Sequence, residues 1–161
     1  MIKQLKKNDW CEWRKIRLEA LKKSPNSFVS SFEEEYKTPN DMWSKQLENS
    51  IKFGYFINDK IVGCSGLLIE KATKISHTAT LFGMYVKDDF RGSGIGFDLV
   101  NFVKDYAKKY SQGLNRIEFS YSDYKKTRGV EYQELFLFLD SDFWEKINDG
   151  QQGLKTTDWQ Q

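Results

Sequence analysis

The feature that most constrains this chain is a glycine-rich junction between an apolar run and an amphipathic pattern. The apolar run ends at Val86, and the residues that follow read K-D-D-F-R-G-S-G-I-G. Where a strand gives way to a helix, the first helical turn offers unpaired N–H donors and the positive end of its dipole. Gly92, Gly94 and Gly96 let the backbone close around an anion without obstruction by Cβ atoms. The junction therefore predicts a site for a phosphate or pyrophosphate group.

The size and composition of the chain predict a single folded domain over residues 1–161. With 39% hydrophobic and 16% aromatic residues, the chain is too apolar to stay disordered. The net charge is +2 and the lysine pairs are scattered, which argues against a nucleic-acid-binding surface. The N-terminus lacks the apolar core of a signal peptide, and no apolar run has the length to span a bilayer. We therefore expect a cytoplasmic protein with no membrane or nucleic-acid partner.

The two cysteines indicate the same compartment. Cys11 and Cys64 are far apart and match no metal-binding or redox spacing, so no metal site is predicted. We expect both to be buried free thiols rather than a disulfide, which suits a reducing cytosol.

Changes in periodicity divide the chain into helices and strands. Helical spacing predicts helices over Trp10–Lys22, Asp41–Asn49 and Gly94–Tyr110. Alternation predicts strands over Ile2–Leu5, Lys52–Ile57, Ile61–Ile69, Thr78–Val86 and Arg116–Tyr121, with a hairpin turn at Asn58-Asp59-Lys60. For two segments the sequence leaves two structures possible. Residues 26–38 form an irregular loop or a short helix, and Glu131–Asp140 forms a helix with an apolar face or a buried strand.

The spacing of the glycines separates this loop from the common nucleotide-binding loops. A dinucleotide loop needs G-x-G-x-x-G, whereas these glycines run G-x-G-x-G. A Walker loop is excluded because no Gly-Lys-Ser/Thr follows. The antiparallel strands expected before the loop also disagree with a doubly wound fold. A glycine-rich turn without a ligand is the remaining alternative.

The segment M-Y-V-K-D-D-F-R-G-S-G-I-G resembles the acetyl-CoA motif of the GNAT acetyltransferase superfamily, Q/R-x-x-G-x-G/A. The resemblance implies an α/β (α+β) fold with a mixed, mostly antiparallel sheet flanked by helices. It implies that loop N–H groups hold the pyrophosphate. The preceding strand, splayed from the next one, would pair with the pantetheine arm like an added strand. The cofactor-binding residues expected on this basis are Met84, Tyr85, Val86, Arg91, Gly92, Ser93, Gly94, Ile95 and Gly96.

The activity implied by the resemblance is N-acetylation with acetyl-CoA as the acetyl donor. The acceptor would be a primary amine of a small molecule, a peptide or a protein. Transfer would be direct, because no cysteine lies near the motif to carry an acyl group. The alternative is a catalytically degenerate acetyl-CoA-binding or interaction module. The sequence does not identify the acceptor, since such pockets are built from variable loops.

The catalytic residues are less clearly marked than the cofactor loop. Many family members carry a tyrosine acid in an N-x-x-A-x-x-L-Y pattern, followed by a Gly-Phe pair. Laid on this chain, the pattern puts Lys125 and Arg128 at the Asn and Ala positions and Tyr132 at the tyrosine. The Gly-Phe position reads Phe136-Leu137. Tyr132 is therefore the candidate general acid, and a packed aromatic side chain is the alternative.

Two further groups of polar residues are weaker candidates. His77 could serve as a base, although a polar turn residue is the favoured interpretation. Some family members use the region between the first helices as an acceptor lid, where the run Glu33-Glu34-Glu35 could contact a cationic amine. A solvated charge run is the favoured interpretation there.

The chain departs from the family pattern after about residue 135. A divergent or a frameshifted tail would explain the departure, since a reading one base later lets Asp142 to Glu145 encode Ile-Phe-Gly. The last strands of the family sheet would then be missing or replaced. An edge exposed in this way would favour strand exchange or a homodimer.

Overall fold

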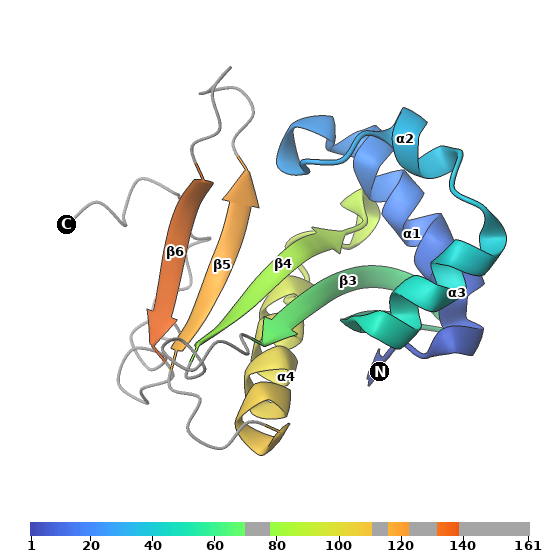
Figure 1. Ribbon diagram of the computed structural model, residues 1–161. Coiled ribbons are helices and arrows are strands. Elements are labelled where there is room, and N and C mark those ends of the chain that lie inside the picture. The colour runs from blue at the N-terminus through green and yellow to red at the C-terminus, as the bar shows by residue number, and fades with distance from the viewer. Residues whose placement is uncertain (70–77, 111–115, 123–131, 139–161) are drawn as a thin grey trace.

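The computed structural model describes residues 1–69, 78–110, 116–122 and 132–138, which form a layered α/β structure (Figure 1). The strands are β1 (Ile2–Gln4), β2 (Ile51–Ile57), β3 (Lys60–Ile69), β4 (Thr78–Val86), β5 (Arg116–Ser122) and β6 (Tyr132–Phe138). The helices are α1 (Trp10–Lys23), α2 (Phe32–Tyr36), α3 (Asn40–Asn49) and α4 (Ile95–Tyr110), with short 3-10 turns η1 (Lys7–Asp9), η2 (Pro25–Ser27) and η3 (Asp88–Phe90). None of the described helices is long and apolar enough to cross a membrane.

Within the described residues, the strands form one 6-stranded sheet in the order of the chain, from β1 to β6. Every neighbouring pair is antiparallel except β4 and β5, which are parallel. A parallel pair needs a crossover that returns the chain to the same end of the sheet, and α4 provides it. This arrangement confirms the prediction of a mixed, mostly antiparallel sheet flanked by helices.

Helices cover both faces of the sheet. Helices α1, α2 and α3 lie over one face, and α4 lies over the other (Figure 1). The first face buries Trp13, Ile16, Leu21, Trp43 and Leu47. The second face buries Phe53, Leu67, Leu81, Leu99, Val103 and Ala107. Because burial of each large apolar side chain is worth about 1.5–3 kcal/mol, the two helical layers hold the central strands firmly in place.

Most elements lie within one or two residues of the bounds that the sequence predicts. Strand β4 matches the predicted range, and residues 26–38 divide into η2, a loop and α2. The predicted hairpin turn is present, since Asn58 and Asp59 have φ values of 48° and 60°, the left-handed conformation of a two-residue turn. The open segment Glu131–Asp140 contains strand β6, so it forms a strand and not a helix.

The expectation that both cysteines are buried is wrong for one of them. Both are free thiols, and Cys64 is buried in β3. Cys11 is exposed, because α1 turns the face that carries Trp13 and Ile16 toward the core and leaves Cys11 on the other side.

Candidate functional site

The site is built around a place where strand β4 leaves its neighbour β5. The two strands pair over Thr78–Leu81 and Arg116–Phe119 and no further. On its other edge, β4 stays paired with β3 as far as Val86. Residues 82–86 therefore have one edge without a strand partner among the described residues. Figure 1 shows β4 and β5 diverging from their common end.

A β-bulge lies at the point of divergence. The register between β3 and β4 shifts between the pairs Cys64–Tyr85 and Gly66–Phe82, so two residues of β4 lie opposite one residue of β3. Gly83 is one of the two and has a φ of 60°. A bulge with a glycine in the left-handed region bends its strand, and here it bends the end of β4 away from the line of β5.

The glycine loop after β4 has the conformation that an anion site requires. Gly92 and Gly94 have φ values of 76° and 85°, and a Cβ on either would meet no atom within 4 Å. The backbone N–H of Asp98 donates to Gly94 O at 2.9 Å, so the N–H groups of Ile95 and Gly96 precede the first helical bond. These free donors at the positive end of α4 fit a pyrophosphate.

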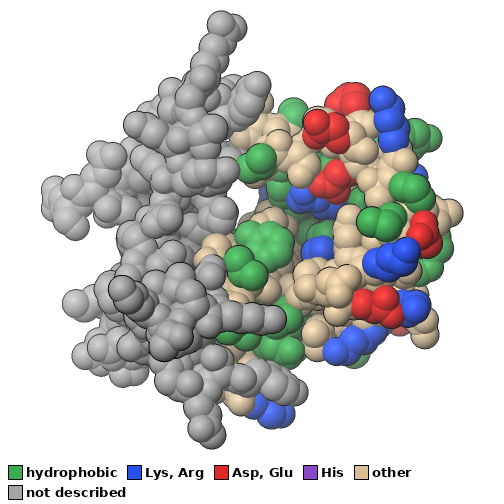
Figure 2. Space-filling model, in the orientation of Figure 1, with side chains coloured by type: hydrophobic (Ala, Val, Ile, Leu, Met, Phe, Trp, Pro, Cys, Tyr) green, Lys and Arg blue, Asp and Glu red, His purple; other side chains and the backbone are tan. Residues whose placement is uncertain are grey.

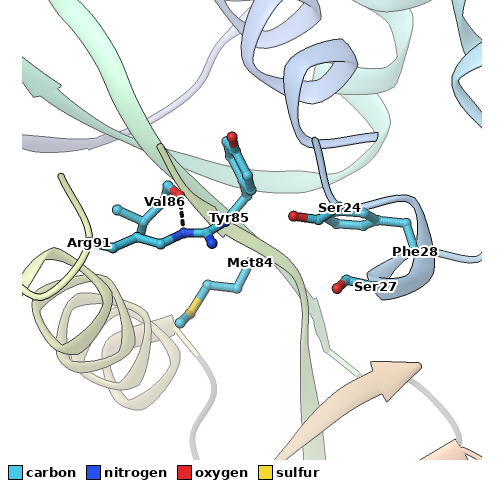
Figure 3. A pocket seen from close by; sticks show the side chains of 7 residues that line it. All are labelled: Ser24, Ser27, Phe28, Met84, Tyr85, Val86 and Arg91. Carbon is cyan, nitrogen blue, oxygen red and sulfur yellow. Dashed lines mark hydrogen bonds between the residues drawn. The ribbon is translucent and has the colours of Figure 1, made fainter. Parts of the chain in front are cut away.

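Arg91 ties this loop to the end of β4. Its Nε donates to the main-chain oxygen of Val86 at 3.0 Å (Figure 3), and its Nη2 pairs with Asp88 at 3.1 Å. The guanidinium also lies over the Tyr85 ring, 5.6 Å from its centroid. One of the main-chain atoms expected to pair with the pantetheine arm, Val86 O, thus already accepts a hydrogen bond.

A pocket of about 280 Å³ opens beside the unpaired edge of β4. It is lined by Ser24, Ser27, Phe28, Met84, Tyr85, Val86 and Arg91 (Figure 3). Met84 and Tyr85 point to opposite sides of the strand, as successive strand residues do, with Met84 toward α4. The sequence analysis did not predict Ser24, Ser27 and Phe28 as site residues, because residues at and after the end of a helix carry no signal that they also face a site.

Tyr85 joins the end of β4 to helix α1. Its hydroxyl donates to Glu19 Oε1 at 3.2 Å, and Lys87 pairs with Glu19 Oε2 at 3.2 Å. Burial, together with the nearby carboxylates of Glu19 and Asp88, raises the pKa of Tyr85 to about 12. The Tyr85 hydroxyl therefore stays protonated at neutral pH and holds α1 against the strand that borders the pocket.

A second pocket, of about 580 Å³, lies along the segment between α1 and α2. Phe28 lines both pockets. Glu33 lines the second one and is exposed, as expected of a solvated charge run. That interpretation is wrong for Glu35, which forms a two-pronged ion pair with Arg17. Glu34 is exposed, and it accepts from the Ser31 N–H in the capping box of α2.

A buried lysine lies on the sheet face under α1. Lys52 of β2 is 8% exposed, and its ammonium lies 4.7 Å from the centre of the Trp13 ring. Burial lowers the pKa of Lys52 to about 8, the Arg17 charge lowers it further, and Glu35 acts in the opposite direction. The sequence predicted only a strand residue here.

The structure describes little of Tyr132, the candidate acid, and of His77, for which a turn residue is the favoured interpretation. Tyr132 is the first residue of β6 and pairs with Ser122 of β5, but its side chain lies outside the described residues. His77 lies outside them altogether. In the part of the chain that is described, no group of three or more His, Cys, Asp or Glu side chains could hold a metal ion.

A strand with an open edge, followed by a glycine loop at a helix N-terminus, is suited to bind an extended cofactor that carries a pyrophosphate. Residues 9–130 match the acetyltransferase (GNAT) family. The chain therefore belongs to the GNAT acetyltransferase family, and it is an acetyltransferase whose acetyl donor is acetyl-CoA.

Solved structures share this fold at low sequence identity. The smu.2055 protein of Streptococcus mutans is 17% identical, with a TM-score of 0.65 over 87% of this chain and 99% of its own. The yncA protein of Salmonella typhimurium, solved with acetyl-CoA, is 14% identical, with a TM-score of 0.65 over 88% and 94%. Diaminobutyrate acetyltransferase EctA of Paenibacillus lautus, in complex with L-2,4-diaminobutyric acid and coenzyme A, is 11% identical, with a TM-score of 0.53 over 74% and 64%. None of the curated proteins compared with the chain matches it.

The loop glycines give a direct test of the cofactor site. We expect Gly94→Ala to raise the Kd for acetyl-CoA about tenfold, because a side chain at its φ of 85° costs about 1–2 kcal/mol. Lys45→Ala is the control, since Lys45 is exposed on α3, on the opposite face of the sheet from α4. Isothermal titration calorimetry measures both. Equal Kd values for the two variants would contradict the assignment.

Lys52 gives a test based on stability. Its pKa is about 8 in the folded chain and 10.5 when exposed, so below pH 8 the folded state carries the full cost of a buried charge. That cost disappears as the pH rises from about 8 to 10.5, where the folded-state lysine is neutral. We expect Lys52→Met to stabilise the protein by about 1–3 kcal/mol at pH 7 and by much less at pH 10.5. Urea unfolding at both pH values measures the difference. A gain that does not change with pH would contradict the buried charge.

Proposed function

We propose that the chain transfers an acetyl group directly from acetyl-CoA to a primary amine of a small molecule, a peptide or a protein. The observation that carries the proposal is the open edge of β4 over residues 82–86, which runs into the loop at the start of α4. A pantetheine arm would add to this edge like a strand, with its pyrophosphate on the loop. The thioester would then lie near the point where β4 leaves β5.

Direct transfer is favoured because the nearest cysteine is a poor nucleophile. Cys64 is 1% exposed, and its Sγ lies 3.8 Å from the main-chain oxygen of Gly83. Burial raises the pKa of the Cys64 thiol to about 12, so the thiolate that would accept an acetyl group is scarcely formed. The acceptor amine itself would therefore attack the thioester within a ternary complex.

In the proposed reaction the acceptor nitrogen forms a bond to the thioester carbonyl carbon, and the carbon–sulfur bond breaks. The amine loses a proton, and the departing sulfur gains one. Main-chain N–H groups on the open edge of β4 are suited to stabilise negative charge on the carbonyl oxygen. We assign the proton that the sulfur gains to Tyr132, and this role stays a prediction.

The second candidate is an acetyl-CoA-binding or interaction module without catalysis. It is favoured by the departures from the family pattern at Lys125, Arg128 and Phe136-Leu137. Against it, the neighbours include an enzyme in complex with an amine and coenzyme A. The two candidates share a cofactor site and differ in whether an amine is consumed.

A binding and turnover experiment separates the two candidates. We expect saturating acetyl-CoA to raise the Tm, since ligand at about 100 times Kd stabilises by about 2.7 kcal/mol. We also expect an amine library to release free CoA, detected with a thiol reagent. A thermal shift without CoA release would favour the module. If acetyl-CoA gives neither a shift nor calorimetric heat, both candidates are wrong.

Tyr132→Phe tests the proposed acid. Because a general acid contributes about 10²–10⁴-fold to the rate, we expect kcat to fall by at least 100-fold, while the Kd for acetyl-CoA stays unchanged. Tyr36→Phe is the control, since Tyr36 is 57% exposed on α2. Steady-state rates from pH 6 to 10 measure both variants. If Tyr132→Phe turns over at the wild-type rate across that range, Tyr132 has no part in the mechanism.

A further inference from the structure

A buried cation without an anionic partner lies on the sheet face under α1, at Lys52. Among the described residues, the Lys52 ammonium has no hydrogen bond or ion pair, and it lies over the Trp13 ring, 4.7 Å from the ring centre. A buried charge without a partner is costly, and burial lowers the pKa of Lys52 accordingly. Lysines are usually exposed, so this placement requires an explanation beyond packing.

The neighbouring charges do not neutralise Lys52. Glu35 accepts three hydrogen bonds from Arg17, one from Nη2 at 2.7 Å and two from Nε at 3.0 and 3.2 Å, so these two charges offset each other. Both side chains are mostly buried, at 15% and 17% exposure. Cys64 also faces Lys52, and it is neutral because its pKa is raised to about 12. Of the three charges of Arg17, Glu35 and Lys52, that of Lys52 is therefore the one without a partner.

Arg17, which lies near Lys52, reaches the open edge of β4. Arg17 Nη1, which is not used by Glu35, lies 3.9 Å from where a Cβ on Gly83 would be. Lys52 pairs with Gly66 of β3, and Gly66 pairs with Phe82 of β4, so the three residues form one row across the sheet. Strands lie about 4.8 Å apart, which puts the ends of this row about 10 Å apart along the sheet.

The middle of the row is an apolar floor. The Phe82 ring lies over Gly66, because a Cβ on Gly66 would come within 2.5 Å of the ring. Figure 2 shows hydrophobic and basic side chains in the hollow of this face, with acidic side chains gathered along its upper rim. An acceptor lying on this floor would have one end at the edge of β4 and the other end near Lys52.

We propose that Lys52, together with Nη1 of Arg17, forms a subsite for a carboxylate of the acceptor, so that the acceptor is an amino acid rather than a polyamine or an aminoglycoside. This inference rests on the proposed acetyl transfer. The acceptor amine lies beside the thioester, where β4 leaves β5, its apolar part lies on Phe82, and its carboxylate supplies the anionic partner that Lys52 lacks. A polycation is disfavoured because Glu35 is already paired with Arg17 and Lys52 would repel it.

The first experiment compares acceptors that differ in one charge. Initial rates of CoA release are measured with natural L-amino acids, with their primary amides and with spermidine, all at the same concentration of acetyl-CoA. We expect kcat/KM for the best amino acid to exceed that for its amide by at least tenfold. An amide or spermidine that reacts as well as every amino acid would overturn the proposal.

Variants at Lys52 then assign the preference to this side chain. We expect Lys52→Met to reduce the ratio of acid to amide kcat/KM at least tenfold, and Lys52→Arg, which keeps the charge, to retain most of it. Lys45→Met is the control, since Lys45 is exposed on α3 and pairs with Asp41. If Lys52 serves only to pack on Trp13, Lys52→Met will change the acid and amide rates alike, and the proposal is wrong.

A binding measurement tests the carboxylate subsite even if no acetyl transfer is detected. If no amine releases CoA, the proposed acetyl transfer fails. Ligand-observed NMR with the same amino acids and amides, on protein saturated with CoA, then tests the subsite alone. Binding of an amino acid that is preferred over its amide and lost in Lys52→Met supports the subsite. Equal binding of acid and amide, or equal binding to both proteins, overturns it.

Discussion

The parting of β4 from β5 is the constraint on which the rest of the structure depends. Strand β4 remains paired with β3 to its last residue, so it stays in the sheet while residues 82–86 lose their partner on the other side. Backbone N–H and C=O groups need hydrogen-bond partners, and an open strand edge readily accepts an extended chain. The arm of acetyl-CoA is such a chain, so in the proposed site cofactor binding would complete the hydrogen-bond ladder that the described strands leave unfinished.

The backbone conformation of the proposed cofactor site could be predicted because its signals are local. The apolar run of β4, the glycines at positions 92 and 94 and the helical pattern of α4 are contiguous, and each requires a particular backbone conformation. The separation of β4 from the next strand was predicted from the family resemblance instead, since no residue pattern indicates where a strand loses its partner. The bulge at Gly83 was not foreseen, because one glycine in an apolar strand also fits ordinary close packing.

The proposed acceptor side could not be predicted because it depends on residues far apart in the sequence. Arg17 and Glu35 are 18 positions apart, and their pairing removes the carboxylate that seemed available to a cationic amine. Lys52 occupies an inward position of an alternating strand, where the pattern alone gives no reason to expect a buried charge. Ser24 and Ser27 line the smaller pocket, but their sequence pattern indicates only the end of a helix.

The charge of Lys52 connects the acceptor side to stability and pH. A carboxylate bound beside Lys52 would favour its charged form and raise its pKa from about 8 toward the ordinary 10.5. By linkage, the same carboxylate binds more tightly when Lys52 is charged, so its affinity falls as the pH rises through about 8. The acceptor amine, in contrast, must lose its proton to react, which favours high pH. An enzyme that needs a charged Lys52 and a neutral amine therefore works best in a pH range in which Lys52 keeps its proton and the bound amine loses one.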